Sequence, residues 1–239
     1  MLVESIFFVL LAFLILLLLV VGFETVGFRL SEALLIFVGS TLLFFSFDPS
    51  ILLYVDGSLG IGIFVPLYIA VFQPFLVVGS SNGLAIGVDV AGFLIPFLIS
   101  LKMIFDRRSP IRASLIGIAC IAALTNITST YVPGEGVLIW NIYVIAIAAS
   151  VIGIGLAKRQ WGSVGPIAYV SGSLGVLLGA DLARFGDILS YQPRGFAFAS
   201  VGGAGVFDAI FLVGVLAVTI DVIFVENVRF INWVQRRWA

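Results

Sequence analysis

The residues of this chain that could do chemistry are acids inside strongly apolar stretches: Asp89, Asp181, Asp208 and Asp221. Three of them stand among glycines, in the segments GVDVAG (residues 87–92), GAD (179–181) and GGAGVFD (202–208). A charged side chain at the centre of a bilayer costs about 2.5–3.5 kcal/mol on insertion scales. These acids are therefore the first candidates for a functional site.

Asp181 and Asp208 form the first candidate pair, because they are expected on consecutive, antiparallel helices. Two carboxylates that face each other in a low dielectric cannot both ionise easily, so one keeps a proton and the pair offers an acid and a base. Such a pair can activate water against a peptide carbonyl, or bind and release a proton or cation. The alternative is structural: Asp181 pairs with Arg184 three residues on, and Asp208 caps a broken helix.

A second candidate site lies around Asp89. Pro96 removes a backbone donor, so a kink is expected at Gly92–Phe93, with Asp89 beside the freed carbonyls. Broken helices with an acid near mid-membrane are how many transporters bind ions. The alternative is a packed proline kink with an aspartate at the membrane interface.

Glycines are predicted to shape both sites. Gly202, Gly203 and Gly205 would let a substrate backbone approach Asp208. The small residues Ala168, Gly172, Gly175 and Gly179 recur at helical spacing, which lets a neighbouring helix approach closely. We interpret this second group as a structural contact that sets where Asp181 points.

The absence of histidine excludes several chemistries. The 239 residues contain none, so serine–histidine proteolysis, a His-Glu-x-x-His zinc site and histidine-ligated haem are ruled out. No phosphate-binding loop is present, and no basic patch with interleaved aromatics supports nucleic-acid binding. We expect no cofactor and no metal. If the chain is an enzyme that acts in the membrane, the carboxylates are nearly its only acid–base groups.

The composition predicts the elements that must position these acids. Hydrophobic residues make up 62% of the chain and charged residues 10%, against about 25% charged in soluble domains. We expect an all-α polytopic membrane protein, a single integral membrane domain over residues 1–239, with a glycine break before the last helix. About eight spans are expected, at roughly 5–23, 33–47, 59–79, 83–105, 111–130, 136–157, 163–183 and 204–225.

The distribution of basic residues predicts an orientation in the cell membrane. With both termini cytoplasmic, nine Lys and Arg residues fall inside and three outside, as the positive-inside rule favours. Asp89, Asp181 and Asp208 then lie toward the same, outer side. Asp221 is expected near the inner surface, because thirteen residues of helix span about 20 Å.

Two resemblances follow from the residues around these acids. Residues 169–181, 201–212 and 87–101, the last with Ile95 and Pro96, look like an uncharacterised family of archaeal and bacterial polytopic membrane proteins. The segment 203–214 more distantly resembles the Gly-x-Gly-Asp helix of presenilin-like intramembrane aspartyl proteases. That family carries a second aspartate on the preceding helix, as Asp181 would be here, and the likeness covers two helices.

The function expected first is therefore that of an intramembrane aspartyl-protease-like protein, with Asp181 and Asp208 as the catalytic pair. The alternative is a proton- or cation-coupled transporter or channel that uses Asp89, Asp181 and Asp208. A third reading is a structural subunit without chemistry. The partners expected are membrane lipid and either a transmembrane-helix substrate or a small ion.

Overall fold

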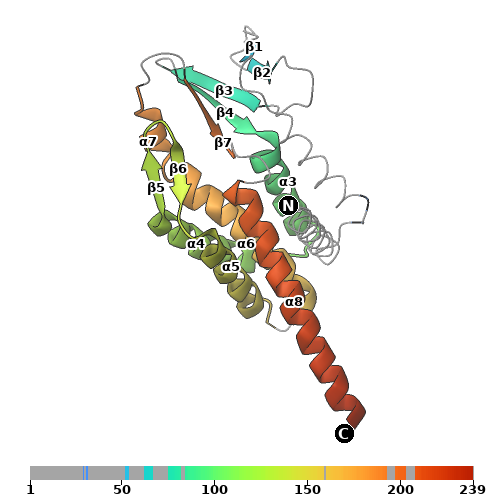
Figure 1. The fold of residues 1–239 in the computed structure, drawn as a ribbon. Helices are drawn as coiled ribbons and strands as arrows, with labels where there is room; N and C mark the ends of the chain where they lie inside the picture. Colours follow the sequence, from blue (N-terminus) through green and yellow to red (C-terminus); the bar gives the residue numbers. More distant parts are fainter. Residues whose placement is uncertain are drawn as a thin grey trace, which may run out of the picture.

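A bundle of helices with a sheet at one end makes up the structure, a computed structural model (Figure 1). The part of the chain that it describes comprises residues 29, 31, 52–53, 62–66, 75–81, 84–158, 160–192, 197–202 and 208–238. The expected spans at 5–23 and 33–47 lie outside these residues.

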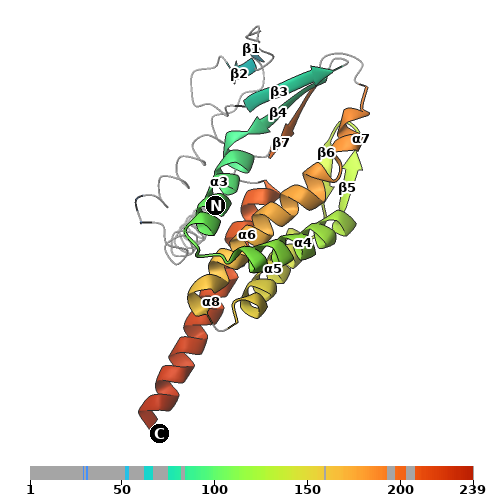
Figure 2. The same ribbon diagram turned by 180° about the vertical axis from the view of Figure 1, so that it is seen from behind.

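Within the described part of the chain, five α-helices form the bundle, and a short sixth helix, α7 (Phe185–Leu189), lies beside the sheet end. The chain passes back and forth between the sheet end and the opposite end, so that sequence neighbours are antiparallel (Figures 1 and 2). The five are α3 (Ile95–Phe105), α4 (Ile111–Thr128), α5 (Ile142–Leu156), α6 (Val164–Val176) and α8 (Ala209–Trp238).

Two of these helices adjoin a π-helical turn, one at its start and the other at its end. The turn η1 (Val90–Leu94) leads into α3, and η3 (Leu177–Leu182) follows α6. Pro96 lies in the first turn of α3, and the helical conformation continues back from it through η1. The irregularity expected at Gly92–Phe93 takes the form of the π-helical turn η1, which lies directly before the proline. A short 3₁₀ turn, η2 (Trp161–Ser163), precedes α6.

The expectation of an all-α fold is wrong, because strands occupy parts of the apolar sequence. One sheet has the strand order β1-β2-β3-β4-β7, in which β4 and β7 are parallel and the other neighbours antiparallel. Its strands are β1 (Leu52–Leu53), β2 (Gly62–Pro66), β3 (Phe75–Ser81), β4 (Leu84–Asp89) and β7 (Ala197–Val201). A separate hairpin of β5 (Ser129–Val132) and β6 (Gly136–Ile139) joins α4 to α5.

The eight-span topology is not supported either. Within the described residues, two helical segments are long and apolar enough to cross a membrane, Ile111–Thr128 and Trp161–Leu189. The expected spans 59–79 and 83–105 contain β2, β3 and β4, whose residues suit a buried strand as well as a helix, because a short continuous apolar run does not distinguish the two. The long segment 195–225 contains strand β7 and the first part of helix α8, so it is not one continuous helix. Of the expected glycine break, Gly202 follows β7 in a turn, and residues 203–205 lie outside the described residues.

Helix α6 is the centre of the bundle, and small residues let its neighbours approach it. A Cβ placed at Gly117 of α4 would lie 2.9 Å from the Cβ of Ser171, and one at Gly153 of α5 would lie 2.9 Å from that of Ala168. A Cβ at Gly214 of α8 would meet the ring of Tyr169 at 3.1 Å. Close backbone approach through glycine is the usual way in which membrane helices gain packing contacts.

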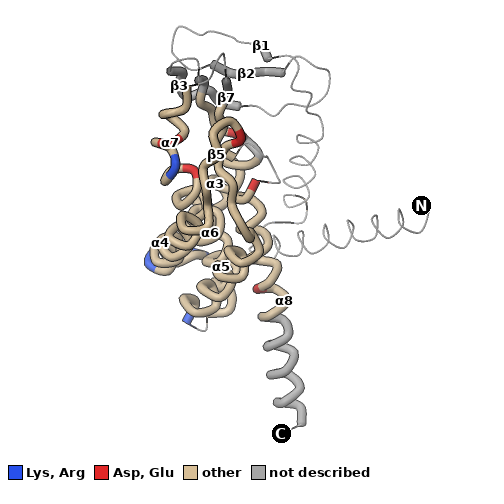
Figure 3. The backbone as a smooth tube through the Cα atoms, turned by 60° about the vertical axis from the view of Figure 1, so that its left-hand side comes forward, with Lys and Arg blue, Asp and Glu red and all other residues tan. Residues whose placement is uncertain are grey.

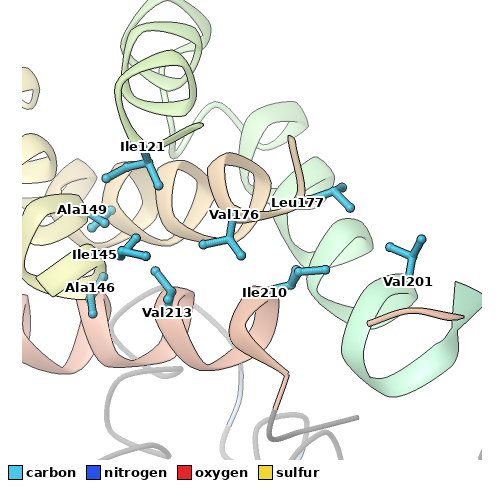
Figure 4. Close-up of a cluster of buried hydrophobic side chains, with 11 residues drawn as sticks. Ile121, Ile145, Ala146, Ala149, Val176, Leu177, Val201, Ile210 and Val213 are labelled. Carbon is cyan, nitrogen blue, oxygen red and sulfur yellow. The ribbon is translucent and has the colours of Figure 1, made fainter. Parts of the chain in front are cut away.

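The apolar core lies on the same helices. One cluster joins side chains from α4, α5, α6 with η3, α8 and strand β7, several of them completely buried (Figure 4). The outer faces of α4 and α5 are different, since large apolar side chains are exposed there. Those on α4 and α5 include Ile111, Leu115, Ile116, Ile127, Val144, Ile147 and Val151.

Candidate functional site

The carboxyl ends of two parallel strands begin the candidate site. Strands β4 and β7 pair in parallel with Val88 opposite Val201, so Asp89 and Gly202 follow at the same edge of the sheet. From that edge β4 continues through η1 into α3, and the chain after β7 leads to α8. The carboxyl ends of parallel strands are a common place for ligand sites in other folds.

Asp89 is completely buried at this edge. Its Oδ1 accepts a hydrogen bond of 2.5 Å from the backbone N–H of Gly92, so the side chain binds one of the free N–H groups at the start of the helical segment. This is a local structural role, close to the second of the two readings from sequence. The burial differs from that reading, which expected an aspartate at the membrane interface.

Gly202 packs against the same turn. A Cβ at this position would lie 2.6 Å from the backbone N of Phe93 and 2.7 Å from the carbonyl carbon of Gly92. Its φ of +75° is also a conformation that favours glycine. Gly202 therefore lets β7 and η1 touch through their backbones. Gly203 and Gly205 lie outside the described residues.

Asp208 caps α8. Its Oδ1 accepts a 2.9 Å hydrogen bond from the N–H of Ile210, and its carbonyl accepts the N–H of Leu212 at 2.9 Å. A carboxylate at a helix N-terminus is stabilised both by these donors and by the helix dipole. Asp208 therefore has the capping role that was the alternative interpretation of the sequence. The capping bond uses Oδ1 and does not involve Oδ2.

Asp181 lies in the π-helical turn η3 and is partly buried. Its carboxylate lies close enough to that of Asp208 for the two to interact electrostatically. Arg184, the expected structural partner of Asp181, pairs instead with Asp187 at 3.8 Å. The structure therefore brings Asp181 and Asp208 together.

A set of hydrogen bonds fixes η3 to the end of α4. The N–H groups of Ala183 and Arg184 bond the carbonyls of Leu178 and Ala180, and the carbonyl between these two, that of Gly179, accepts from Asn126 Nδ2 at 3.3 Å. A π-helical turn leaves backbone groups for such side chains, and these turns are frequent at functional sites.

Arg184 completes this connection. Its Nη2 donates to the carbonyl oxygens of Asn126 and Ser129, each at 3.3 Å. Tyr131 of β5 lies nearby, where burial raises the pKa of its hydroxyl and the neighbouring Tyr191 and Asp187 raise it further. Sequence reasoning missed Asn126 and assigned Arg184 to another partner, because neither contact follows a local spacing.

The glycines of the small-residue group serve two neighbours rather than one. A Cβ at Gly172 would lie 3.3 Å from the Cα of Gly214 on α8. A Cβ at Gly175 would lie 2.6 Å from Ile121, and one at Gly179 2.8 Å from the Cα of Ala122, both on α4. These contacts place α6 between α4 and α8, and Gly179 packs η3, which carries Asp181, against α4.

Asp221 is buried between α5 and α8. It is 2% exposed, and Ser150 Oγ of α5 donates to its Oδ1 at 2.5 Å. Its expected depth near the inner membrane surface stays a prediction. A serine on another helix gave no sequence signal for this pairing.

Basic residues gather at the helix ends away from the sheet (Figure 3). Lys102 lies in the last turn of α3, Arg107 and Arg108 follow that helix, Arg112 lies in the first turn of α4, and Lys158 follows α5. The expected membrane orientation stays a prediction. Among the described residues, no group of three or more His, Cys, Asp or Glu side chains could hold a metal ion.

Comparison with known families gives one match. Residues 68–220 match the model of a family described as a protein of unknown function (DUF1614), and since this is more than half of the chain, the protein belongs to that family. The match includes Asp89, Asp181 and Asp208 and almost all of the described bundle. No curated protein and no solved structure matches the chain significantly.

Proposed function

We propose that this chain is a multi-pass membrane protein, with both termini cytoplasmic, that hydrolyses peptide bonds in the membrane through Asp181 and Asp208. The observation that carries the proposal is the electrostatic interaction between these two carboxylates, one from η3 and the other from the residue before α8. The 18 residues of α4 would extend about 27 Å, close to the thickness of the hydrocarbon core. Large apolar side chains on the outer faces of α4 and α5 suit contact with lipid.

In this mechanism the two acids share one proton. The ionised carboxylate takes a proton from water while the water oxygen attacks the carbonyl carbon, and the protonated carboxyl gives its proton to the carbonyl oxygen. Collapse of the tetrahedral intermediate breaks the C–N bond. The proton first taken from water passes to the departing amine, and the other carboxylate takes back a proton from one hydroxyl of the intermediate as the acid product forms, so the pair again holds one proton.

The position of Asp208 suits such a role. Its capping bond to Ile210 fixes the side chain, and the N-terminus of α8 stabilises negative charge there. Asp181 lies in the π-helical turn η3 rather than at a helix N-terminus, so the two acids have different environments. Pairs of titratable groups in unlike environments are the usual basis for an acid and a base in one site.

Cleavage of a transmembrane peptide tests the proposal. The full chain in liposomes, with a panel of labelled single-helix peptides, should yield products that mass spectrometry detects. Asp181→Asn should abolish cleavage. Asp208→Ser should also abolish it, although serine keeps an oxygen for the Ile210 N–H. Asp106→Asn, an exposed position on the end of α3, is the matched control and should cleave normally.

A proton- or cation-coupled transporter is the second candidate, favoured by the complete burial of Asp89 at the start of η1. Acids at interrupted helices bind coupling ions in many transporters. This candidate predicts that an inward proton or sodium gradient drives solute uptake into liposomes and that Asp89→Asn abolishes it. Peptide cleavage without any gradient-driven flux would exclude it.

A further inference from the structure

A second acidic site lies inside the bundle, away from the Asp181–Asp208 pair. Asp221 follows Asp208 by thirteen residues on α8, which is about 20 Å of helix. It is 2% exposed and Ser150 is 1% exposed, so neither side chain reaches the surface of the described structure.

The two oxygens of the Asp221 carboxyl have different surroundings. Oδ1 accepts the hydroxyl of Ser150 at 2.5 Å. Oδ2 is buried and makes no hydrogen bond with the described part of the chain. An ionised carboxylate needs donors or a cation on both oxygens when it is removed from water.

The described helices around Asp221 supply no such cation. In α5, Tyr143 is the one titratable residue, and it is exposed at the first turn. The titratable residue of α6 is Tyr169, and that of α3 is Lys102. Lys102 is exposed and forms an ion pair with Asp106 at 3.4 Å. Over residues 209–224, α8 itself carries no other charged residue than Asp221.

A cation as the missing partner would need more ligands than this site offers. Calcium takes about six to eight oxygen ligands, and the polar side chains of α5 are those of Tyr143 and Ser150 alone. The backbone carbonyls of α5 and α8 are used within their helices. A proton neutralises a carboxyl without further ligands, and a buried acid without a partner generally takes one up.

We propose that Asp221 and Ser150 form a proton-binding site at the interface of α5 and α8, in which Ser150 holds one oxygen and the proton resides on the other. Proton loss would leave a charge between two packed helices, so the contact of α8 with α5 depends on occupancy. The site does not depend on catalysis by Asp181 and Asp208.

Infrared spectroscopy of the full chain in lipid nanodiscs tests this site. At neutral pH the wild type should show the carbonyl stretch of a protonated carboxyl group, Asp221→Asn should lose that component, and Asp106→Asn should keep it. Ser150→Ala should shift its frequency, because the hydrogen bond to Oδ1 is gone. If Asp221→Asn does not fold, Asp221→Glu should move the band instead of removing it.

Two results would overturn the proposal. The first is an identical spectrum for the wild type and Asp221→Asn, which would mean that Asp221 is ionised. The second is loss of the band when sodium replaces a bulky organic cation at constant ionic strength, which would mean that the site holds a metal cation.

Discussion

Asp208, just before α8, and Asp221, within α8, have different surroundings. Asp208 stands before the first residue of α8, where the N–H of Ile210 and the helix dipole stabilise its charge. Asp221 lies where the helix has no free backbone donors, and a serine on α5 is its hydrogen-bond partner. The comparison shows that position along a helix, more than burial alone, decides whether an acid is suited to hold a charge or a proton.

The largest expected effect comes from a change of charge at the inner position. Asp221→Lys places an unpaired cation between α5 and α8 and should lower the free energy of unfolding by about 3–5 kcal/mol. Asp208→Lys removes the cap and opposes the dipole, and should lower it by about 1–2 kcal/mol. Unfolding in mixed micelles followed by circular dichroism measures both. Equal losses would remove the distinction between the two sites.

The next effect concerns Gly214, where α8 packs against α6 at a position between Asp208 and Asp221. Gly214→Ala should destabilise the protein by about 1–3 kcal/mol, because the new methyl group would meet Tyr169 and Ser173. Gly155→Ala on α5 is the matched control, with open space around its Cβ. The control should be neutral or stabilising, since alanine has the higher helix propensity. A neutral Gly214→Ala would show that α8 does not pack as described.

A smaller effect separates the two roles of Asp208. Asp208→Ala should lower the free energy of unfolding by about 1 kcal/mol, because it removes the cap, whereas Asp208→Ser should retain most of it. Thermal unfolding in detergent compares the variants. Both should lack peptide cleavage, because catalysis needs the carboxylate and capping does not. Cleavage by Asp208→Ser would assign Asp208 a structural role alone.

The smallest effect is expected at Ser150. Ser150→Ala removes the donor to Asp221 Oδ1 and should destabilise the protein by about 0.5–1.5 kcal/mol. Ser190→Ala, which removes an exposed hydrogen bond to the carbonyl of Asp187, should change stability by less than about 0.5 kcal/mol. A combination of Ser150→Ala with Asp221→Asn shows whether the residues are coupled. Strict additivity would mean that they do not interact.

Part of this structure could be predicted from the sequence. Helices α4, α5 and α6 (with η3) begin and end within several residues of the spans expected for them, because long apolar runs and their charged boundaries are local signals. Helix α8 begins five residues after the start of its expected span and extends to Trp238, beyond the expected end at 225. Strands β2 to β4 could not be predicted in the same way. Their apolar runs are compatible with a membrane helix, and only pairing between distant segments, such as β4 with β7, determines that they are strands.

The candidate site, like the fold, could be predicted from the sequence only in part. Asp181 and Asp208 could be paired from sequence, because consecutive antiparallel helices bring such residues together. The support around them could not be, since Asn126 binds the Gly179 carbonyl from 53 residues away. The partner of Asp221 could not be predicted either, because Ser150 lies 71 residues away in the sequence. Contacts of this kind depend on how helices are rotated against one another, which the spacing of apolar residues does not determine.

The most direct test of the central claim is a double-mutant cycle on the proposed catalytic pair. Cleavage of one transmembrane peptide would be measured for the wild type, Asp181→Asn, Asp208→Ser and the double variant, in liposomes of one composition. If the two acids act as a unit, each single variant falls to background and the double variant falls no further. Substantial cleavage by either single variant, or by both together, would contradict the assignment of these residues as the catalytic pair.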